Sequence, residues 1–231
     1  MTASRRRQLA VNLAAFEQRL AQACAAAGRP RSAVTLVAVT KTFPSDDVRA
    51  LADLGVTDFG ENREAEARAK AAALPDLRWH FVGRLQRNKC RSIATYATAV
   101  HSVDRVELAG ALADGAARAG RLIDVLVQVS LDGDPDRGGA QPADVPAVAA
   151  ACDRAAGLRL SGVMAVAPMA ADPDAAFAGL AAVAASLRSA YPRADAISAG
   201  MSADLESAVR NGATHVRVGT ALLGGRTPLS G

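Results

Sequence analysis

Short apolar runs rich in β-branched residues alternate along this chain with longer segments of helical periodicity. The apolar runs predict eight strands, at residues 34–40, 56–60, 79–83, 99–103, 123–130, 160–167, 196–199 and 215–219. Most of the segments between them are rich in alanine and charged on one side. These segments predict seven helices, at residues 45–54, 64–73, 88–96, 104–119, 143–156, 174–190 and 202–211.

The regular alternation of strand and helix predicts a parallel sheet built from βα units. Eight strands that look buried on both faces favour closure into a barrel over an open, doubly wound sheet. The open sheet also lacks its fingerprint, because no G-x-G-x-x-G follows the first strand. We therefore expect a single (β/α)8 TIM barrel as one domain over residues 1–231, with an extra amphipathic helix at residues 9–27 packed outside it.

The composition narrows the classes of function. A net charge of +4 is a weak signal for an anionic partner, and with 3% aromatic residues the chain offers few stacking platforms for nucleic-acid bases. No segment approaches the roughly 20 uninterrupted apolar residues of a membrane span. The three cysteines lie far apart without a C-x-x-C pair, which argues against a disulfide framework or a thiolate metal cage. We expect a cytoplasmic protein with no nucleic-acid or membrane partner.

Active sites of (β/α)8 barrels lie at the carboxyl ends of the strands, and Lys41 directly follows the first predicted strand. A barrel mouth is partly dehydrated and disfavours an ammonium ion, so a lysine there can form an imine with an aldehyde. A lysine that only extends its stem into water fits the same position. The position of Lys41 alone leaves both readings open.

The loops after the seventh and eighth predicted strands favour the imine. Residues 198–202 precede a predicted helix with Asp204 in its first turn, and residues 218–220 precede a short helical stretch. Glycine beside a hydroxyl residue at a helix N-terminus presents N–H groups to an anion, and barrels often bind a phosphate there. Ser202 and Thr220 fit simple helix caps as well. Together, next to Lys41, the two loops favour a ligand that carries both a phosphate and an aldehyde.

Arg217 lies inside the last predicted strand, between Val216 and Val218. Because strand residues alternate between faces, its guanidinium should enter the barrel while the two valines face the outer helices. A charge in that position needs a partner. A pyridine nitrogen is one candidate, which the arginine would keep unprotonated. A salt bridge to Glu61 is the other.

The segments that carry these residues resemble a known family over nearly the whole chain. They read LVAVTKTFP at 36–44, DFGEN at 58–62, WHFVGRLQRNK at 79–89, HSVD at 101–104, SGVMAVAP at 161–168, SAGMSADLESAV at 198–209 and VRVGTALLG at 216–224. Several long motifs in this order are similar to those of the pyridoxal phosphate homeostasis proteins. These are relatives of the barrel domain of bacterial alanine racemase.

The resemblance implies a barrel of fold type III that holds pyridoxal 5'-phosphate (PLP) as a Schiff base on Lys41. It implies further that Arg217 faces the pyridine nitrogen and that Asn62 lies near the ring. The residues it places around the phosphate are Met201, Ser202, Gly219 and Thr220. The implied role is to buffer PLP or deliver it to PLP-dependent apo-enzymes without efficient turnover, and we expect a monomer.

The chain departs from the family pattern at four positions. The family often has a second lysine where this chain has Phe43, which puts in doubt any role of that lysine in passing the cofactor onward. Arg63 stands where a tyrosine is common. Arg84 and Arg87 replace a proline and a serine and add positive charge near the predicted mouth.

An amino-acid racemase is the alternative function. A two-base racemase needs an acid/base group on each face of the ring, and the alanine racemase relatives supply the second from a tyrosine of a separate β domain. Tyr96 and Tyr191 are the only tyrosines here, and both fall at predicted peripheral helices. A metal-dependent hydrolase is disfavoured, because the three histidines lie on different strands without H-x-H or H-E-x-x-H spacing and fit core or rim positions: His80, His101 and His215.

Overall fold

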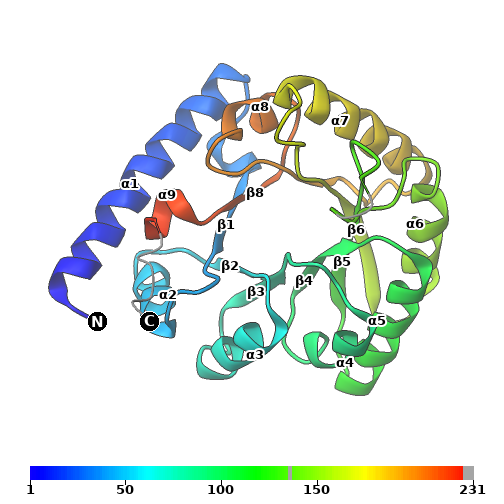
Figure 1. The fold of residues 1–231 in the computed structure, drawn as a ribbon, viewed down its shortest axis with the longest axis horizontal. Coiled ribbons are helices and arrows are strands. Elements are labelled where there is room, and N and C mark those ends of the chain that lie inside the picture. Colours follow the sequence, from blue (N-terminus) through cyan, green and yellow to red (C-terminus); the bar gives the residue numbers. More distant parts are fainter. Residues whose placement is uncertain (135–136, 226–231) are drawn as a thin grey trace.

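The computed structural model describes residues 1–134 and 137–225, and in this part of the chain eight parallel strands form a closed barrel (Figure 1). Neighbouring strands pair in chain order, and β8 pairs with β1 to complete the ring. The strands are β1 (Thr35–Val39), β2 (Asp58–Glu61), β3 (Arg78–Phe81), β4 (Ala99–Val103), β5 (Ile123–Gln128), β6 (Leu158–Met164), β7 (Ala196–Ser198) and β8 (His215–Val218). The predicted (β/α)8 barrel is confirmed.

Helices cover the outside of this ring (Figure 1). They are α2 (Ser45–Asp53), α3 (Glu64–Ala73), α4 (Cys90–Ile93), α5 (Val106–Ala119), α6 (Val145–Arg154), α7 (Pro173–Ala190), α8 (Leu205–Arg210) and α9 (Thr220–Leu223). The extra N-terminal helix is confirmed as α1 (Ala3–Ala26), which lies outside the barrel along α2, α8 and α9. None of the helices within the described residues is long and apolar enough to cross a membrane.

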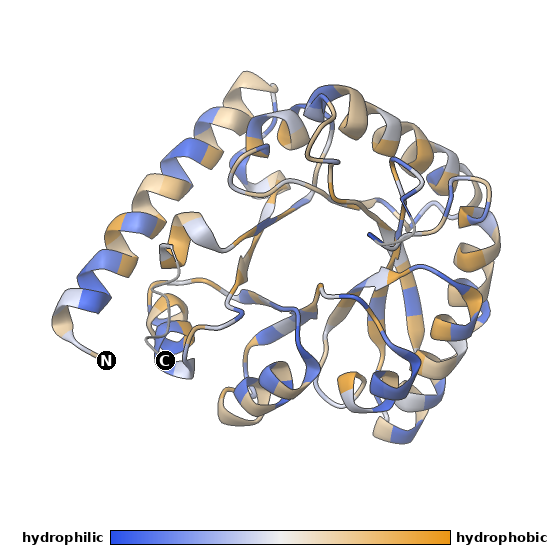
Figure 2. Cartoon of the chain, in the orientation of Figure 1, coloured by the Kyte–Doolittle hydropathy of each residue, from blue (hydrophilic) through white to orange (hydrophobic). Residues whose placement is uncertain are grey.

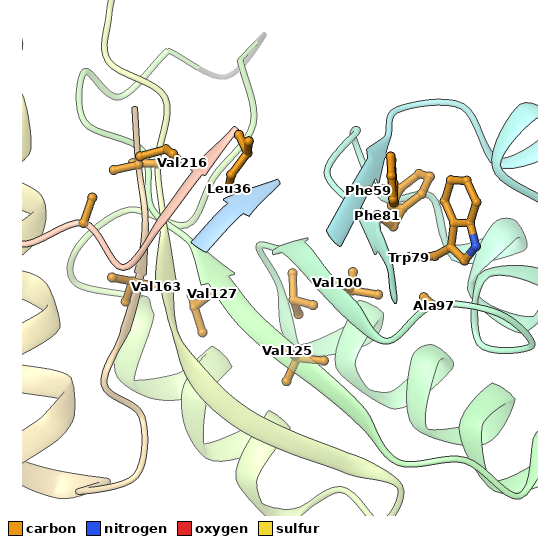
Figure 3. Packing of buried hydrophobic residues seen from close by; sticks show 14 of the residues in the cluster. Leu36, Phe59, Trp79, Phe81, Ala97, Val100, Val125, Val127, Val163 and Val216 are labelled. Atoms are coloured by element: carbon orange, nitrogen blue, oxygen red, sulfur yellow. The ribbon is translucent and has the colours of Figure 1, made fainter. Parts of the chain in front are cut away.

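The main apolar core lies between the sheet and the helices. Outward-facing strand residues such as Leu36, Val127 and Val216 belong to it, as the twofold alternation of a strand requires (Figure 3). Phe59 and Trp79 form an aromatic cluster on the outer side of β2 and β3, with ring centroids 5.9 Å apart. This packing anchors the strands that carry the site.

One face of α1 belongs to the same core. Leu9, Leu13, Phe16 and Leu20 are buried at intervals of three and four residues, which is the spacing of an amphipathic helix. Figure 2 shows hydrophilic and hydrophobic residues alternating along α1. Burial of these side chains fixes α1 against the barrel.

The inside of the barrel has a different character. A small apolar cluster of Leu126, Met164 and Ala196 fills one part of it. The rest holds buried polar side chains from five strands, namely Asp58, His80, His101, Ser198 and Arg217. Such side chains need hydrogen-bond partners within the protein, because they are almost completely shielded from water.

Several predicted boundaries were wrong. The helix expected at 88–96 is a 3-10 turn (Arg87–Lys89) followed by the short α4. The helix expected from residue 202 begins at Leu205. The Met201 N–H donates to Asp204 Oδ1 at 2.6 Å, so residues 201–204 form a turn. The sequence also places a loop at residues 132–139, after the fifth predicted strand; of this loop, residues 135 and 136 lie outside the described residues.

Candidate functional site

The structure brings all the predicted site residues together at the carboxyl ends of β1, β2, β7 and β8. They line one cavity of about 300 Å³. Its lining residues are Val39, Lys41, Asn62, Val82, Val166, Met201, Ser202, Ala203, Arg217, Gly219 and Thr220. Lys41 and Arg217 are the ionisable residues in this lining.

Lys41 follows β1 directly, and the residue after it has an unusual backbone conformation. Thr42 has a φ of +70°, in the left-handed region that costs a threonine roughly 1–3 kcal/mol. Its N–H donates a 2.6 Å hydrogen bond to Glu66 Oε1, and the Phe43 N–H donates to the Thr40 carbonyl oxygen at 3.0 Å. The chain therefore turns sharply after Lys41, which leaves that side chain at the cavity.

A buried ionic cluster supports this turn from outside the barrel. Lys70 donates from Nζ to the Thr40 carbonyl oxygen at 2.7 Å, to Glu61 Oε1 at 2.6 Å and to Glu66 Oε1 at 2.7 Å. The Thr40 hydroxyl also donates to Glu61 Oε1, at 2.6 Å. Burial raises the pKa of Glu61, although the hydrogen bonds from Lys70 and Thr40 oppose this shift. The sequence reading missed this cluster; the i,i+4 spacing of Glu66 and Lys70 was its only local signal.

Arg217 points into the barrel as the alternation of β8 predicts, while Val216 and Val218 belong to the outer core. Its Nη1 donates to Ser198 Oγ at 2.6 Å, and its Nη2 donates to the Ala165 carbonyl oxygen at 2.9 Å. Burial lowers the pKa of Arg217 to about 10, so the group remains charged at neutral pH. The proposed salt bridge to Glu61 was wrong, because Glu61 points outward to Lys70.

Two glycines let the loops after β7 and β8 approach the cavity. Gly200 has a φ of +91°, and a Cβ there would lie 2.5 Å from Ala208 Cβ. A Cβ on Gly219 would lie 3.0 Å from the Val39 carbonyl oxygen. Gly219 is the N-cap residue of α9 and Thr220 its first residue, whereas Ser202 lies in the turn before α8 and does not cap it.

Helix α1 forms hydrogen bonds with the loop after β7 and with α9, which the sequence did not reveal. Arg19 donates from Nη1 to the Ser202 carbonyl oxygen at 2.7 Å and forms a two-point ion pair with Glu206. The Asn12 amide donates to the Leu222 carbonyl oxygen at 2.9 Å. Helix α1 therefore contacts the backbone of both segments, although it contributes no lining residue.

Asn62 supplies a polar atom that the protein leaves unpaired. Its Oδ1 is buried and has no hydrogen-bond partner among the described residues. A buried unpaired amide oxygen costs about 1–3 kcal/mol. Since Asn62 lines the cavity, a ligand with a hydrogen-bond donor can recover this energy.

The other sequence expectations concern histidines, tyrosines and arginines. His101, expected at a core or rim position, is fully buried inside the barrel, and no group of three His, Cys, Asp or Glu in the described chain is arranged to hold a metal ion. Neither Tyr96 nor Tyr191 lines the cavity.

The four positions that depart from the family pattern lie at partly or fully exposed places. Phe43 is half-buried, and the Arg5 guanidinium lies 5.6 Å from its ring centroid. The three arginines are exposed: Arg63, Arg84 and Arg87.

Comparisons with known proteins match most of the chain to one family. The family model "Alanine racemase, N-terminal domain" matches residues 11–227. A pyridoxal phosphate homeostasis protein of Corynebacterium glutamicum is 45% identical over 205 residues, which cover 86% of this chain and 93% of that protein. The chain belongs to the pyridoxal phosphate homeostasis protein family. The resemblance read from the motifs is thereby confirmed.

Solved structures agree with this assignment. The structure of PipY from Synechococcus elongatus PCC7942 with PLP bound is 37% identical, with a TM-score of 0.82, and the match covers 94% of this chain and all of that one (100%). Alanine racemase from Corynebacterium glutamicum is 17% identical, with a TM-score of 0.72 over 94% of this chain and 60% of the racemase. The second likeness shows a shared fold alone.

Proposed function

We propose that this protein binds PLP through a Schiff base on Lys41 and serves in PLP homeostasis without efficient turnover. The observation that carries the proposal is the convergence of seven residues, chosen from the sequence alone, on one cavity in a member of this family. A relative that is 37% identical is described with PLP bound. The unpaired Asn62 Oδ1 also fits a ligand that carries a hydrogen-bond donor, such as a ring hydroxyl group.

The chemistry of the lining matches the parts of PLP. Lys41 would supply the amine for the aldehyde, and Arg217 would supply a guanidinium that is charged at neutral pH for the ring nitrogen. Ser202 and Thr220 supply hydroxyl groups for the phosphate, with Met201 and Gly219 beside them. When bound, PLP supplies an electron sink. This sink is weaker when the ring nitrogen faces an arginine, because the nitrogen then stays unprotonated.

The lining also supports binding over turnover. Removal of an α-proton and its return to the opposite face needs two acid/base groups, and each contributes about 10²- to 10⁴-fold to the rate. Among the described lining residues Lys41 is the group able to act as such a base, since Arg217 stays protonated. Slow exchange of an α-hydrogen is compatible with this arrangement, and fast racemisation is not.

We further propose that the protein works in the cytoplasm as a monomer and transfers PLP to apo-enzymes. The three cysteines are unpaired and buried, as is usual in a reducing compartment. Burial raises the pKa of Cys90 to about 11 and that of Cys152 to about 12, so neither thiol is reactive at neutral pH.

Incubation of the PLP-loaded protein with each common L-amino acid in heavy water tests the absence of turnover. α-Deuteration and chirality are followed over time, with a bacterial alanine racemase as the positive control. We expect no racemisation near the roughly 10 s⁻¹ that is typical of metabolic enzymes. Racemisation at that rate on any amino acid establishes the alternative, a PLP-dependent racemase.

A further inference from the structure

A continuous row of hydrogen bonds crosses the inside of the barrel and ends at Arg217. Asp58 Oδ1 lies 2.8 Å from His80 Nε2, and His80 Nδ1 lies 2.9 Å from His101 Nε2. His101 Nδ1 lies 2.9 Å from Ser198 Oγ, which accepts the 2.6 Å hydrogen bond from Arg217. All five side chains are buried, and they come from five different strands. We call these five residues the Asp58–Arg217 row.

The two ends of the row constrain the direction of its bonds. Arg217 can only donate, so Ser198 Oγ accepts from it. Burial pushes the pKa of Asp58 upward, but hydrogen bonds from His80, Thr57 and Arg78 outweigh this and hold that pKa well below its usual range. The ionised carboxylate can only accept, and His80 must therefore donate to it from Nε2.

The middle of the row follows from charge. Burial and the neighbouring His80, His215 and Arg217 lower the pKa of His101 far below its ordinary value, so its ring is neutral. If His101 donates from Nε2 to His80, both rings are neutral and His101 Nδ1 accepts the Ser198 hydroxyl proton. The opposite direction makes His80 an imidazolium, a further buried cation, and leaves the Ser198 proton without an acceptor in the row.

The direction of the row determines how well Ser198 accepts a hydrogen bond from Arg217. A buried guanidinium needs hydrogen-bond acceptors, and the two that the structure gives it among the described residues are Ser198 Oγ and the Ala165 carbonyl oxygen. The Ser198 oxygen is the better acceptor when its own proton is donated to His101, because hydrogen bonds in a chain polarise one another. The far carboxylate of Asp58 thereby supports the arginine without contacting it.

We propose that Asp58, His80, His101 and Ser198 are positioning residues, which form a one-directional hydrogen-bonded row and hold the Arg217 guanidinium at the cavity. The row itself is independent of any ligand. Its effect on PLP retention rests on the proposed function.

The third histidine, His215, lies beside the row but does not belong to it. The His215 ring lies in the same part of the barrel, with centroid distances of 6.3 Å to His80 and 6.1 Å to His101. Its Nδ1 pairs with the Thr214 hydroxyl at 2.8 Å, so it is a neighbour of the row and not a member of it. Arg78 and Asp124 are the charged side chains near His215 beyond the row itself.

Nitrogen NMR of the unmodified protein tests the direction directly. The sequence has three histidines, so a ¹⁵N-histidine-labelled sample gives three ring systems, assigned by single His→Gln variants. At neutral pH we expect His80 and His101 both to carry the proton on Nε2, with bare Nδ1 atoms. A proton on Nδ1 of His101, or a doubly protonated His80, overturns the proposed direction.

Variants at Asp58 test whether the far carboxylate sets the tautomers. Asp58→Asn retains an oxygen acceptor for His80 and should keep both rings protonated on Nε2. Asp58→Ala removes the acceptor, and His101 should then populate the form protonated on Nδ1. Circular dichroism confirms folding in each case. If His101 stays fully protonated on Nε2 in Asp58→Ala, Asp58 does not control the row.

A PLP titration tests the positioning role. Ser198→Ala removes one of the two acceptors of Arg217, the one that belongs to the row, and should weaken PLP binding about tenfold. Ser161→Ala removes the same atom from a neighbouring strand, where the hydroxyl bonds Asp124, and should change the Kd less than twofold. Equal affinity of the two variants overturns the positioning role while PLP binding stands. If the wild type binds no PLP, the proposed function fails, and the NMR result still decides the row.

Discussion

Arg19 of α1 donates a 2.7 Å hydrogen bond to the backbone carbonyl oxygen of Ser202, at the rim of the cavity. A helix that lies outside the barrel thus holds a loop that carries proposed phosphate ligands. The same guanidinium pairs with Glu206, and this hydrogen bond lowers the pKa of Glu206 and raises that of Arg19. The amphipathic helix is therefore part of the support of the site.

Arg19→Ala should weaken PLP binding about threefold to tenfold, because the Ser202 loop loses a charge-assisted hydrogen bond. The barrel should remain folded, since the apolar face of α1 is unchanged. Arg7→Ala, at an exposed position of the same helix, is the matched control and should leave the Kd unchanged. Equal Kd values in a fluorescence titration of the two variants contradict the supporting role of Arg19.

Ser202→Ala and Thr220→Ala should each weaken PLP binding by about 1–3 kcal/mol, the value of a hydrogen bond to a charged group. Ser189→Ala serves as control, because its hydroxyl bonds only the carbonyl oxygen of Ala185 on an exposed helix face. Binding isotherms of the single and double variants give the comparison. An unchanged affinity in the double variant places the phosphate elsewhere.

Gly200→Ala should destabilise the fold and impair PLP binding together. At a φ of +91° alanine is strained, and its Cβ would lie 2.5 Å from Ala208 Cβ, so the loop must shift. We expect a loss of about 2 kcal/mol or more in the free energy of unfolding. The control is Gly110→Ala inside α5, where nothing lies within 4 Å; it should be neutral or stabilise by up to about 1 kcal/mol. Similar urea midpoints for the two variants contradict this account.

Stability should fall as the pH drops below about 6.5, the ordinary pKa of histidine. Burial, reinforced by His80, lowers the pKa of His215 to about 4, and burial also lowers the pKa of His101 well below its ordinary value. The unfolded chain then binds more protons than the folded one between pH 6.5 and 4, so the stability present above 6.5 is lost as the pH falls through this window.

Each such histidine contributes a slope of about 1.4 kcal/mol per pH unit within the window. His215→Gln should therefore reduce the slope by about that amount between pH 6 and 5. Urea unfolding at several pH values measures it. If the variant has the wild-type slope, the pKa of His215 does not differ between the folded and unfolded states, and the account is contradicted.

The order of the strands and the end of the barrel at which the cavity lies could both be predicted from local patterns. Strand-length apolar runs are short and bounded, so eight of them can be counted, and the strand-end rule then selects Lys41 and the two glycine-hydroxyl loops. Alternation along β8 predicted the inward direction of Arg217. These features depend on residues that are adjacent in the sequence.

What the sequence missed depends on contacts between distant segments. Arg19 and Ser202 are 183 residues apart, and no local pattern relates α1 to that loop. Glu61 was one of two candidate partners for Arg217 inside the barrel, but it faces Lys70 on the outer side of β2. The late start of α8 follows from a side-chain hydrogen bond of Asp204 to the Met201 N–H, which competes with helix formation.

Borohydride reduction of the PLP-loaded protein, followed by peptide mass spectrometry, tests the central claim most directly. The chain has three lysines, and each lies in a different environment. Lys41 lines the cavity, Lys70 is buried between Glu61 and Glu66, and Lys89 lies 3.6 Å from Glu64. We predict that a near-visible absorption band disappears on reduction and that the phosphopyridoxyl group is found on Lys41, with Lys41→Ala unlabelled. Labelling of Lys70 or Lys89 in its place, or no stable label at all, contradicts the account.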